Sequence, residues 1–214
     1  MTVIEPREAY SLLADEYDTA PNALISLEER TMAPLLRELR GRRVVDVGTG
    51  TGRWAKYVSA RGAFAVGVDF CRNMLCAAPF PAILADARRL PLPDSCADAV
   101  ICAFTLGYAP ASFAELGRIV RSGGTVFVSD VHPDALRRGW KRTFRHDGVA
   151  IEIAHQSYAL EDLKAPGLEP AQLMEPCLGL PEKAIFEHAG CADRFAEAAR
   201  WPAIFVAQFI RTVA

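Results

Sequence analysis

The sequence predicts an α/β fold in which helices cover both faces of a doubly wound, mostly parallel sheet. A short apolar run passes through a glycine-rich turn into a helical pattern at V-V-D-V-G-T-G-T-G-R-W, residues 44–54. Strand-like and helix-like segments then alternate up to residue 131. The run that begins at Asp98, D-A-V-I-C-A-F, is almost continuously apolar, which is typical of strands buried on both faces.

The composition indicates an ordinary globular protein, and we expect a single domain over residues 1–214. Hydrophobic residues make up 51% and the net charge is −2, which argues against disorder and against a general nucleic-acid-binding surface. No apolar run approaches the roughly 20 residues of a membrane span, and the first residues lack a signal-peptide pattern. We therefore expect a cytoplasmic protein with no membrane or nucleic-acid partner. None of the six cysteines forms a C-x-x-C pair, so we expect reduced thiols and no metal site.

Helices are expected ahead of the first strand. Between residues 7 and 40, leucines and tyrosines recur at helical spacing, interrupted by Pro21 and Pro34. We interpret residues 1–41 as an N-terminal helical cap. Tyr10 and Tyr17 fit either packing within an amphipathic helix or contact with a ligand.

The glycine spacing in the turn indicates which ligand it suits. Gly48, Gly50 and Gly52 form G-x-G-x-G, with Asp46 two residues before the first glycine. A dinucleotide fingerprint needs G-x-G-x-x-G, so this spacing argues against a nicotinamide cofactor.

Two later strands also end in acids. Asp69 follows F-A-V-G-V, and Asp86 follows A-I-L-A. Ligands of open α/β sheets bind outside the carboxyl ends of the strands, where a carboxylate can accept hydrogen bonds from ribose hydroxyls. We expect this role for Asp69, with a helix cap as the alternative. Asp86 by itself would be an ordinary turn residue. Because it is the third acid at the end of a predicted strand, after Asp46 and Asp69, we consider it a candidate ligand-binding residue.

Residues 44–130, about two-fifths of the chain, resemble four consecutive motifs of the class I S-adenosylmethionine-dependent methyltransferases. The D-x-G-x-G-x-G turn resembles the first motif, and R-I-V-R-S-G-G resembles the family's R-V-L-x-P-G-G step, with Ser122 replacing the proline. The resemblance implies S-adenosyl-L-methionine as cofactor, S-adenosyl-L-homocysteine as product, and an adenine contact at Asp86. The candidate cofactor-binding residues are Tyr17, Asp46, Gly48, Thr49, Gly50, Asp69, Phe70, Met74, Asp86, Ala87, Ala103 and Phe104.

The pattern changes after residue 131. Two strand-like runs flank Asp147-Gly148, which predicts a β-hairpin inserted within residues 132–158 as a lid. A short helix is expected from Leu160, strands at 169–177 and from Ala203, and a helix-and-loop insertion at 181–200. The expected fold is therefore Rossmann-like, with seven strands, the N-terminal cap and the inserted hairpin.

Methyl transfer from a sulfonium needs little beyond positioning, so a general base is optional. His132, expected at the end of the fifth strand, is the candidate catalytic base, or else simply begins a loop with Pro133. Tyr108 follows the fourth strand and could orient an acceptor or form a wall of the adenine pocket.

The sequence lacks the motifs of methyltransferases that act on DNA or on catechols, which leaves a small organic molecule as the expected methyl acceptor. The fourth strand ends in C-A-F-T rather than N/D-P-P-Y, no Pro-Cys lies near it, and we find no acids for a magnesium site. We expect residues 132–158 and the N-terminal helices to form the acceptor pocket, with Trp140 and Arg142 binding the substrate. A planar or acidic molecule suits the aromatic and basic side chains of this segment, but a solvated hairpin is the alternative. The basic residues are Arg137, Arg138, Lys141, Arg142 and Arg145.

Two other functions stay open at this point. A nicotinamide-dependent oxidoreductase would share the predicted sheet, and a non-catalytic S-adenosylmethionine-binding or assembly protein would share the glycine turn. The sequence is compatible with either a monomer or a homodimer.

Overall fold

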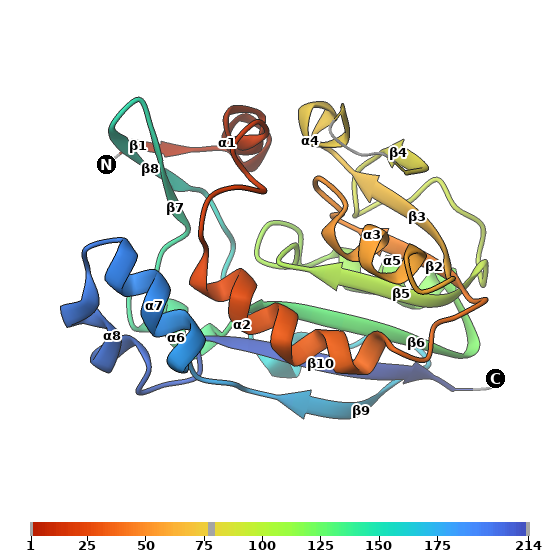
Figure 1. Ribbon diagram of the computed structural model, residues 1–214. Coiled ribbons are helices and arrows are strands. Elements are labelled where there is room, and N and C mark those ends of the chain that lie inside the picture. The colour runs from red at the N-terminus through yellow and green to blue at the C-terminus, as the bar shows by residue number, and fades with distance from the viewer. Residues whose placement is uncertain (1, 77–79, 213–214) are drawn as a thin grey trace.

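The main sheet has seven strands in the order β4-β3-β2-β5-β6-β10-β9 (Figure 1). The computed structural model describes residues 2–76 and 80–212. Strands β4, β3, β2, β5 and β6 run parallel, and β10 runs antiparallel to both β6 and β9. This confirms the predicted doubly wound, mostly parallel sheet of seven strands. The strands are β2 (Arg43–Val47), β3 (Phe64–Asp69), β4 (Ala82–Leu84), β5 (Ala97–Ala103), β6 (Val120–Val131), β9 (Leu168–Met174) and β10 (Ile204–Arg211).

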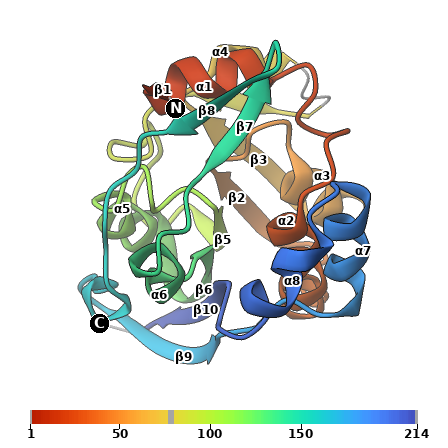
Figure 2. The ribbon, with the colours of Figure 1, turned by 90° about the vertical axis from the view of Figure 1, so that its left-hand side faces the viewer.

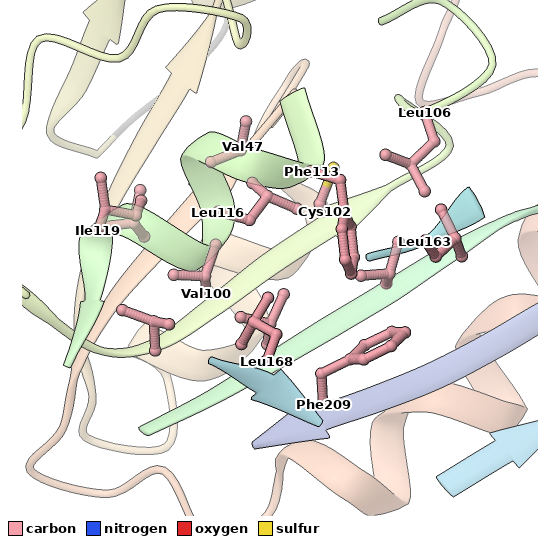
Figure 3. Close-up of a cluster of buried hydrophobic side chains, with 14 of the residues drawn as sticks. Val47, Val100, Cys102, Leu106, Phe113, Leu116, Ile119, Leu163, Leu168 and Phe209 are labelled. Carbon is pink, nitrogen blue, oxygen red and sulfur yellow. The ribbon is translucent and has the colours of Figure 1, made fainter. Parts of the chain in front are cut away.

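Helices cover both faces of this sheet (Figure 2). Each face buries its own hydrophobic core. One core lies beneath α5, where Phe113, Leu116 and Ile119 pack against strand residues such as Val100 and Phe209 (Figure 3). The other lies beneath α2, η1 and α3. The helices are α1 (Pro6–Leu13), α2 (Ala23–Met32), η1 (Ala33–Leu36), α3 (Arg53–Ser59), α4 (Arg72–Cys76), α5 (Ser112–Ile119), α6 (Pro133–Arg137), η2 (Leu160–Asp162), α7 (Leu180–His188) and α8 (Ala192–Ala198).

Local sequence signals explain several element boundaries. The Asn22 side chain accepts hydrogen bonds from Leu24 N at 2.9 Å and Ile25 N at 3.2 Å, so it caps α2 just after Pro21 has interrupted the helical pattern. Strand β5 is buried over most of its length because β2 and β6 flank it and helices cover both faces. Helix α5 ends at Ile119, and β6 begins at the next residue, Val120.

A second, smaller sheet lies beyond the carboxyl ends of the parallel strands (Figure 1). It contains the predicted hairpin, β7 (Thr143–His146) and β8 (Val149–Ile153), and an unexpected strand β1 (Thr2–Ile4) that pairs in parallel with β8. Asp147 and Gly148 have φ angles of 49° and 77°, as a two-residue type I′ turn requires. The pairing of β1 with β8 joins the N-terminal segment to the inserted hairpin.

Candidate functional site

The glycine turn between β2 and α3 lies against the end of β3. The amides of Gly48 and Thr49 donate to the carbonyl of Val68 at 2.8 and 3.0 Å. Gly48 has a φ of +72°, and a Cβ at this position would lie 1.8 Å from Thr105 Oγ1. Both the backbone angle and the space at this position therefore require glycine.

Asp46 holds this turn to the start of α3. Its Oδ2 accepts hydrogen bonds from Thr49 Oγ1 at 2.7 Å and from Ala55 N at 3.0 Å. Burial raises the pKa of Asp46 from 3.8 to about 6. The motif acid therefore fixes the shape of the turn as well as lining the cavity next to it.

Asp69 connects the turn to the next strand end. Its Oδ2 accepts from Gly50 N and its Oδ1 from Cys71 N, both at 2.8 Å. The bond to Cys71 is local to the chain, one residue before α4 begins at Arg72. Burial raises the pKa of this carboxyl, while the backbone donors at Cys71 and Gly50 oppose that shift.

Asp86 is more exposed and follows β4 by two residues. Its carboxylate forms a bidentate pair with Arg88, with Nη2 and Oδ2 2.6 Å apart. The hydrogen bonds from Arg88 lower the pKa of Asp86 below its ordinary value. Asp86 is therefore a charged acceptor at the rim of the cavity.

These strand ends border a first cavity of about 240 Å³. All twelve candidate cofactor-binding residues line it, and so does Tyr108. Thr105, which we expected to face the methionine part of the cofactor together with Ala103 and Phe104, also lines it. Its lining also contains residues that we did not predict, namely Glu5, Pro6, Arg53, Trp54, Val68, Ala85, Arg88, Ala109 and Gln156. Local sequence could not indicate Glu5 and Gln156, because they are about 150 positions apart and follow the paired strands β1 and β8.

A buried glutamate supports this cavity from below. Glu28 on α2 accepts hydrogen bonds from Arg53 at 2.5 Å, Trp54 Nε1 at 2.9 Å and Ser129 Oγ at 2.8 Å. Burial raises the pKa of Glu28, and the Arg53 guanidinium opposes that shift. The cluster joins α2, α3 and β6 beneath the turn. No local pattern in the sequence indicates it, because its members are far apart along the chain.

A second cavity, of about 540 Å³, adjoins the first. The two cavities share four aromatic residues, Tyr10, Tyr17, Phe104 and Tyr108. Trp140 and Arg142 line the second cavity, so the structure brings all three predicted substrate-binding residues together there. The rest of its wall comes from α1, α2 and the segment 140–153.

An acid at the end of β6 holds Arg142 in place. Asp130 is completely buried, accepts from Gly107 N at 2.7 Å and forms an ion pair with the Arg142 guanidinium. Burial opposes the charge of Arg142, but the Asp130 carboxylate outweighs it and raises the arginine's pKa. Arg142 Nη1 lies 3.5 Å from Tyr108 Oη, which also accepts from Tyr10 Oη at 3.0 Å.

His132 reaches neither cavity. Its Nδ1 accepts from Asp134 N at 3.1 Å, so the ring proton lies on Nε2, which donates to Glu175 at 2.8 Å. The imidazole is 4% exposed and has no free nitrogen. Its surroundings do not support the expected general base; they match the alternative that His132 begins the loop and caps α6.

The predicted positive charge of the segment 132–158 is largely neutralised or directed elsewhere. Arg137 pairs with Asp134, and Lys141 Nζ pairs with Glu152 at 2.7 Å. Arg138 lies over the ring of Trp201, 3.7 Å from its centroid, and does not line the cavity. Of the five basic residues, Lys141, Arg142 and Arg145 line the second cavity, and the first two of these are paired with carboxylates.

Two kinds of site are absent from the described part of the chain. Within residues 2–76 and 80–212, no helix is long and apolar enough to cross a membrane. In the same ranges, no three acidic, histidine or cysteine side chains cluster as metal ligands.

Known proteins resemble this chain in sequence and in structure. The family model described as a methyltransferase domain matches residues 45–128. A demethylmenaquinone methyltransferase of Mycobacterium bovis is 31% identical over 140 residues, covering 59% of this chain and 59% of that enzyme. An S-adenosylmethionine-dependent methyltransferase structure from Mesorhizobium loti superposes with a TM-score of 0.68 at 19% identity, covering 89% of this chain and all of that one.

The fold by itself does not determine the reaction. The crystal structure of the [4+2]-cyclase SpnF superposes with a TM-score of 0.67 at 18% identity, over 100% of this chain and 98% of that one. The chain also spans only about three-fifths of the length of the curated methyltransferase above. Residues 45–128 therefore resemble a methyltransferase domain, and the whole chain has the fold of S-adenosylmethionine-dependent methyltransferase structures.

Proposed function

We propose that the chain binds S-adenosylmethionine in the first cavity and transfers its methyl group to a small organic molecule in the second. The observation that carries this proposal is the junction of the two cavities at Tyr10, Tyr17, Phe104 and Tyr108. In-line displacement requires donor and acceptor compartments that meet at the reacting atoms. A single cavity for one ligand would not need this shared wall.

The groups in the first cavity fit this cofactor. Asp69 offers a buried carboxylate for the two ribose hydroxyls, and Asp86 offers a charged acceptor for the adenine amino group. The turn at Gly48 lets the backbone approach the methionine part closely, since a Cβ there has no room. Phe104, with a φ of 51°, turns the chain at the end of β5 and lines the same end of the cavity.

When bound, S-adenosylmethionine supplies a methyl group that its sulfonium already activates for displacement. The chain's own role is therefore to orient the acceptor and to exclude water. Trp140, Phe144 and Ile153 provide apolar wall for the acceptor, and Tyr108 provides a hydroxyl at the junction. No step requires His132.

The names of relatives support a small-molecule acceptor without specifying it. The Mycobacterium bovis relative is named for demethylmenaquinone, and a relative from Serratia marcescens, 28% identical, is named for malonyl-[acyl-carrier protein]. These two names describe different acceptors, so neither is transferred to this chain.

Calorimetry with S-adenosylhomocysteine is the direct test of the cofactor assignment. We expect binding that Asp69→Ala weakens, and no binding of NADH. Absence of binding at millimolar ligand, or tight binding of NADH, would overturn the proposal. A radiolabelled methyl donor with a broad acceptor panel then tests transfer. Cofactor binding without transfer to any acceptor would favour a non-catalytic binding protein.

A further inference from the structure

A row of hydrogen-bonded polar side chains connects the wall of the second cavity to the first cavity. It runs from Asp130 through Arg142 and Tyr108 to Tyr10. Tyr10 and Tyr108 line both cavities, and Arg142 lines the second. The arrangement therefore lies where an acceptor's reacting atom would meet the methyl donor.

The hydrogen-bond directions leave the Tyr108 proton free. Tyr10 donates to Tyr108 Oη at 3.0 Å, and Arg142 Nη1 faces the same oxygen at 3.5 Å. Burial raises the pKa of Tyr10 well above 10, so Tyr10 keeps its proton and remains the donor. With its oxygen accepting from two sides, Tyr108 can direct its own O–H at a ligand.

Arg142 supplies a positive charge next to Tyr108. Its side chain is 8% exposed, and Nε is a buried nitrogen without a hydrogen-bond partner among residues 2–76 and 80–212. A buried N–H without a partner destabilises a protein unless a ligand or water accepts from it. The guanidinium is also tightly confined, because a Cβ at Gly107 would lie 2.6 Å from Nη2.

No buried base accompanies Tyr108 and Arg142 among the described residues that line the second cavity. Asp130 does not line the cavity and already accepts from Gly107 N, Val131 N and Arg142. The one carboxylate in the described lining, Glu16, belongs to an exposed residue. A hydroxyl or amine that must lose a proton during transfer would find no buried acceptor for it there.

We propose that the second cavity takes a planar, largely apolar molecule that carries an ionised oxygen, and that Tyr108 Oη–H positions this oxygen for methylation beside the positive charge of the Arg142 guanidinium. This inference rests on the proposed methyltransferase function. In the step, the oxyanion forms an O–CH3 bond, the S–CH3 bond breaks, and its electron pair stays on sulfur. No proton is released, which suits a site with a hydroxyl donor, an adjacent cation and no buried base in its described lining.

The walls of the cavity agree with a planar body. Phe104, Trp140, Phe144 and Ile153 add aromatic and branched surface to the lining. Arg145 is exposed and adds a positive charge to the lining at the rim. Among the described residues, no carboxylate lies within salt-bridge distance of it. An anionic group entering past the rim therefore meets this positive charge before it reaches Tyr108.

Three ligands of one shape test this proposal: 2-naphthoate, 2-naphthol and 2-naphthylamine. Each is titrated by calorimetry into wild-type protein saturated with S-adenosylhomocysteine. We expect naphthoate to bind at least tenfold more tightly than naphthylamine, with naphthol between them. Equal binding of naphthoate and naphthylamine, or no binding of naphthoate, would overturn the inference.

Two single substitutions then test the roles of Tyr108 and Arg142. Tyr108→Phe should weaken naphthoate binding by about tenfold or more, as expected for a hydrogen bond to a charged group, and change naphthylamine binding less than threefold. Arg142→Lys, which keeps a cation opposite Asp130, should also weaken naphthoate binding. Tyr57→Phe is the matched control, since Tyr57 Oη donates to Ala33 O and lines neither cavity. Equal losses for all three ligands in Tyr108→Phe would show that Tyr108 only shapes the wall.

The affinity of each variant for S-adenosylhomocysteine separates the two hypotheses. If the wild type does not bind S-adenosylhomocysteine, the proposed function fails. If it binds S-adenosylhomocysteine but shows no preference for naphthoate, the acceptor class alone is wrong.

Discussion

A methyl group added at Gly48 should damage both stability and cofactor binding. At a φ of +72°, an alanine costs about 1–2 kcal/mol of backbone strain. Its Cβ would also lie 1.8 Å from Thr105 Oγ1 and 2.9 Å from Thr105 Cβ. Thr105 must then move, which breaks its 3.1 Å hydrogen bond to Ala103 O and forces local repacking at about 1–3 kcal/mol.

We therefore expect Gly48→Ala to lower the free energy of unfolding by about 2–5 kcal/mol, measured by urea denaturation. Gly41→Ala is the matched control, since Gly41 has a φ of +73° and no atom within 4 Å of the place where an alanine Cβ would lie. That variant should lose only the strain, about 1–2 kcal/mol. The double variant Gly48→Ala/Thr105→Ala should recover part of the difference, because the Oγ1 and Cγ2 contacts are gone.

Cofactor affinity provides the second measurement. In calorimetry, Gly41→Ala should bind S-adenosylhomocysteine like the wild type, because Gly41 lies outside both cavities. Gly48→Ala should bind at least tenfold more weakly, since the displaced turn and Thr105 both line the first cavity. If Gly48→Ala matched Gly41→Ala in both stability and affinity, the argument from close packing at the turn would be refuted.

Three further predictions concern acids and the acceptor wall. Asp69→Ala should weaken S-adenosylhomocysteine binding more than Asp86→Ala does. The buried Asp69 carboxylate would accept hydrogen bonds from two ribose hydroxyls, each contributing about 1.5–3 kcal/mol, whereas the more exposed Asp86 would accept one from the adenine amino group. Equal affinities of the two variants in calorimetry would contradict this. Burial raises the pKa of Asp46 to about 6, so the folded state holds that proton more tightly and its ionisation costs stability as pH rises from about 4 to 6. The wild type should therefore lose about 2–3 kcal/mol of unfolding free energy between pH 4 and pH 7 that Asp46→Asn does not lose. A difference between the two proteins that stays constant with pH would refute the raised pKa of Asp46. Trp140→Ala should raise the KM for the acceptor or lower kcat, while its affinity for the cofactor stays within about threefold of the wild type. Unchanged kinetics on an identified acceptor would show that Trp140 does not contact the acceptor.

The sequence by itself determined the order and type of most core elements. The glycine turn, the apolar run of β5 and the strand-end acids are local signals, because strand burial and positive φ angles restrict the residue types that a position accepts. Parallel strands place their carboxyl ends at one edge of the sheet, so these local signals also predicted a shared cavity edge. The same logic located the hairpin at Asp147-Gly148.

The tertiary structure alone decided which polar groups are free to act. His132 and Arg142 looked alike in the sequence as candidates near the site. Packing provided His132 with the partners Asp134 and Glu175, and it left Arg142 Nε without one among the described residues. Hydrogen bonds and ion pairs form between residues that a whole fold brings within about 3 Å, often across many tens of positions, and local sequence carries no record of that distance.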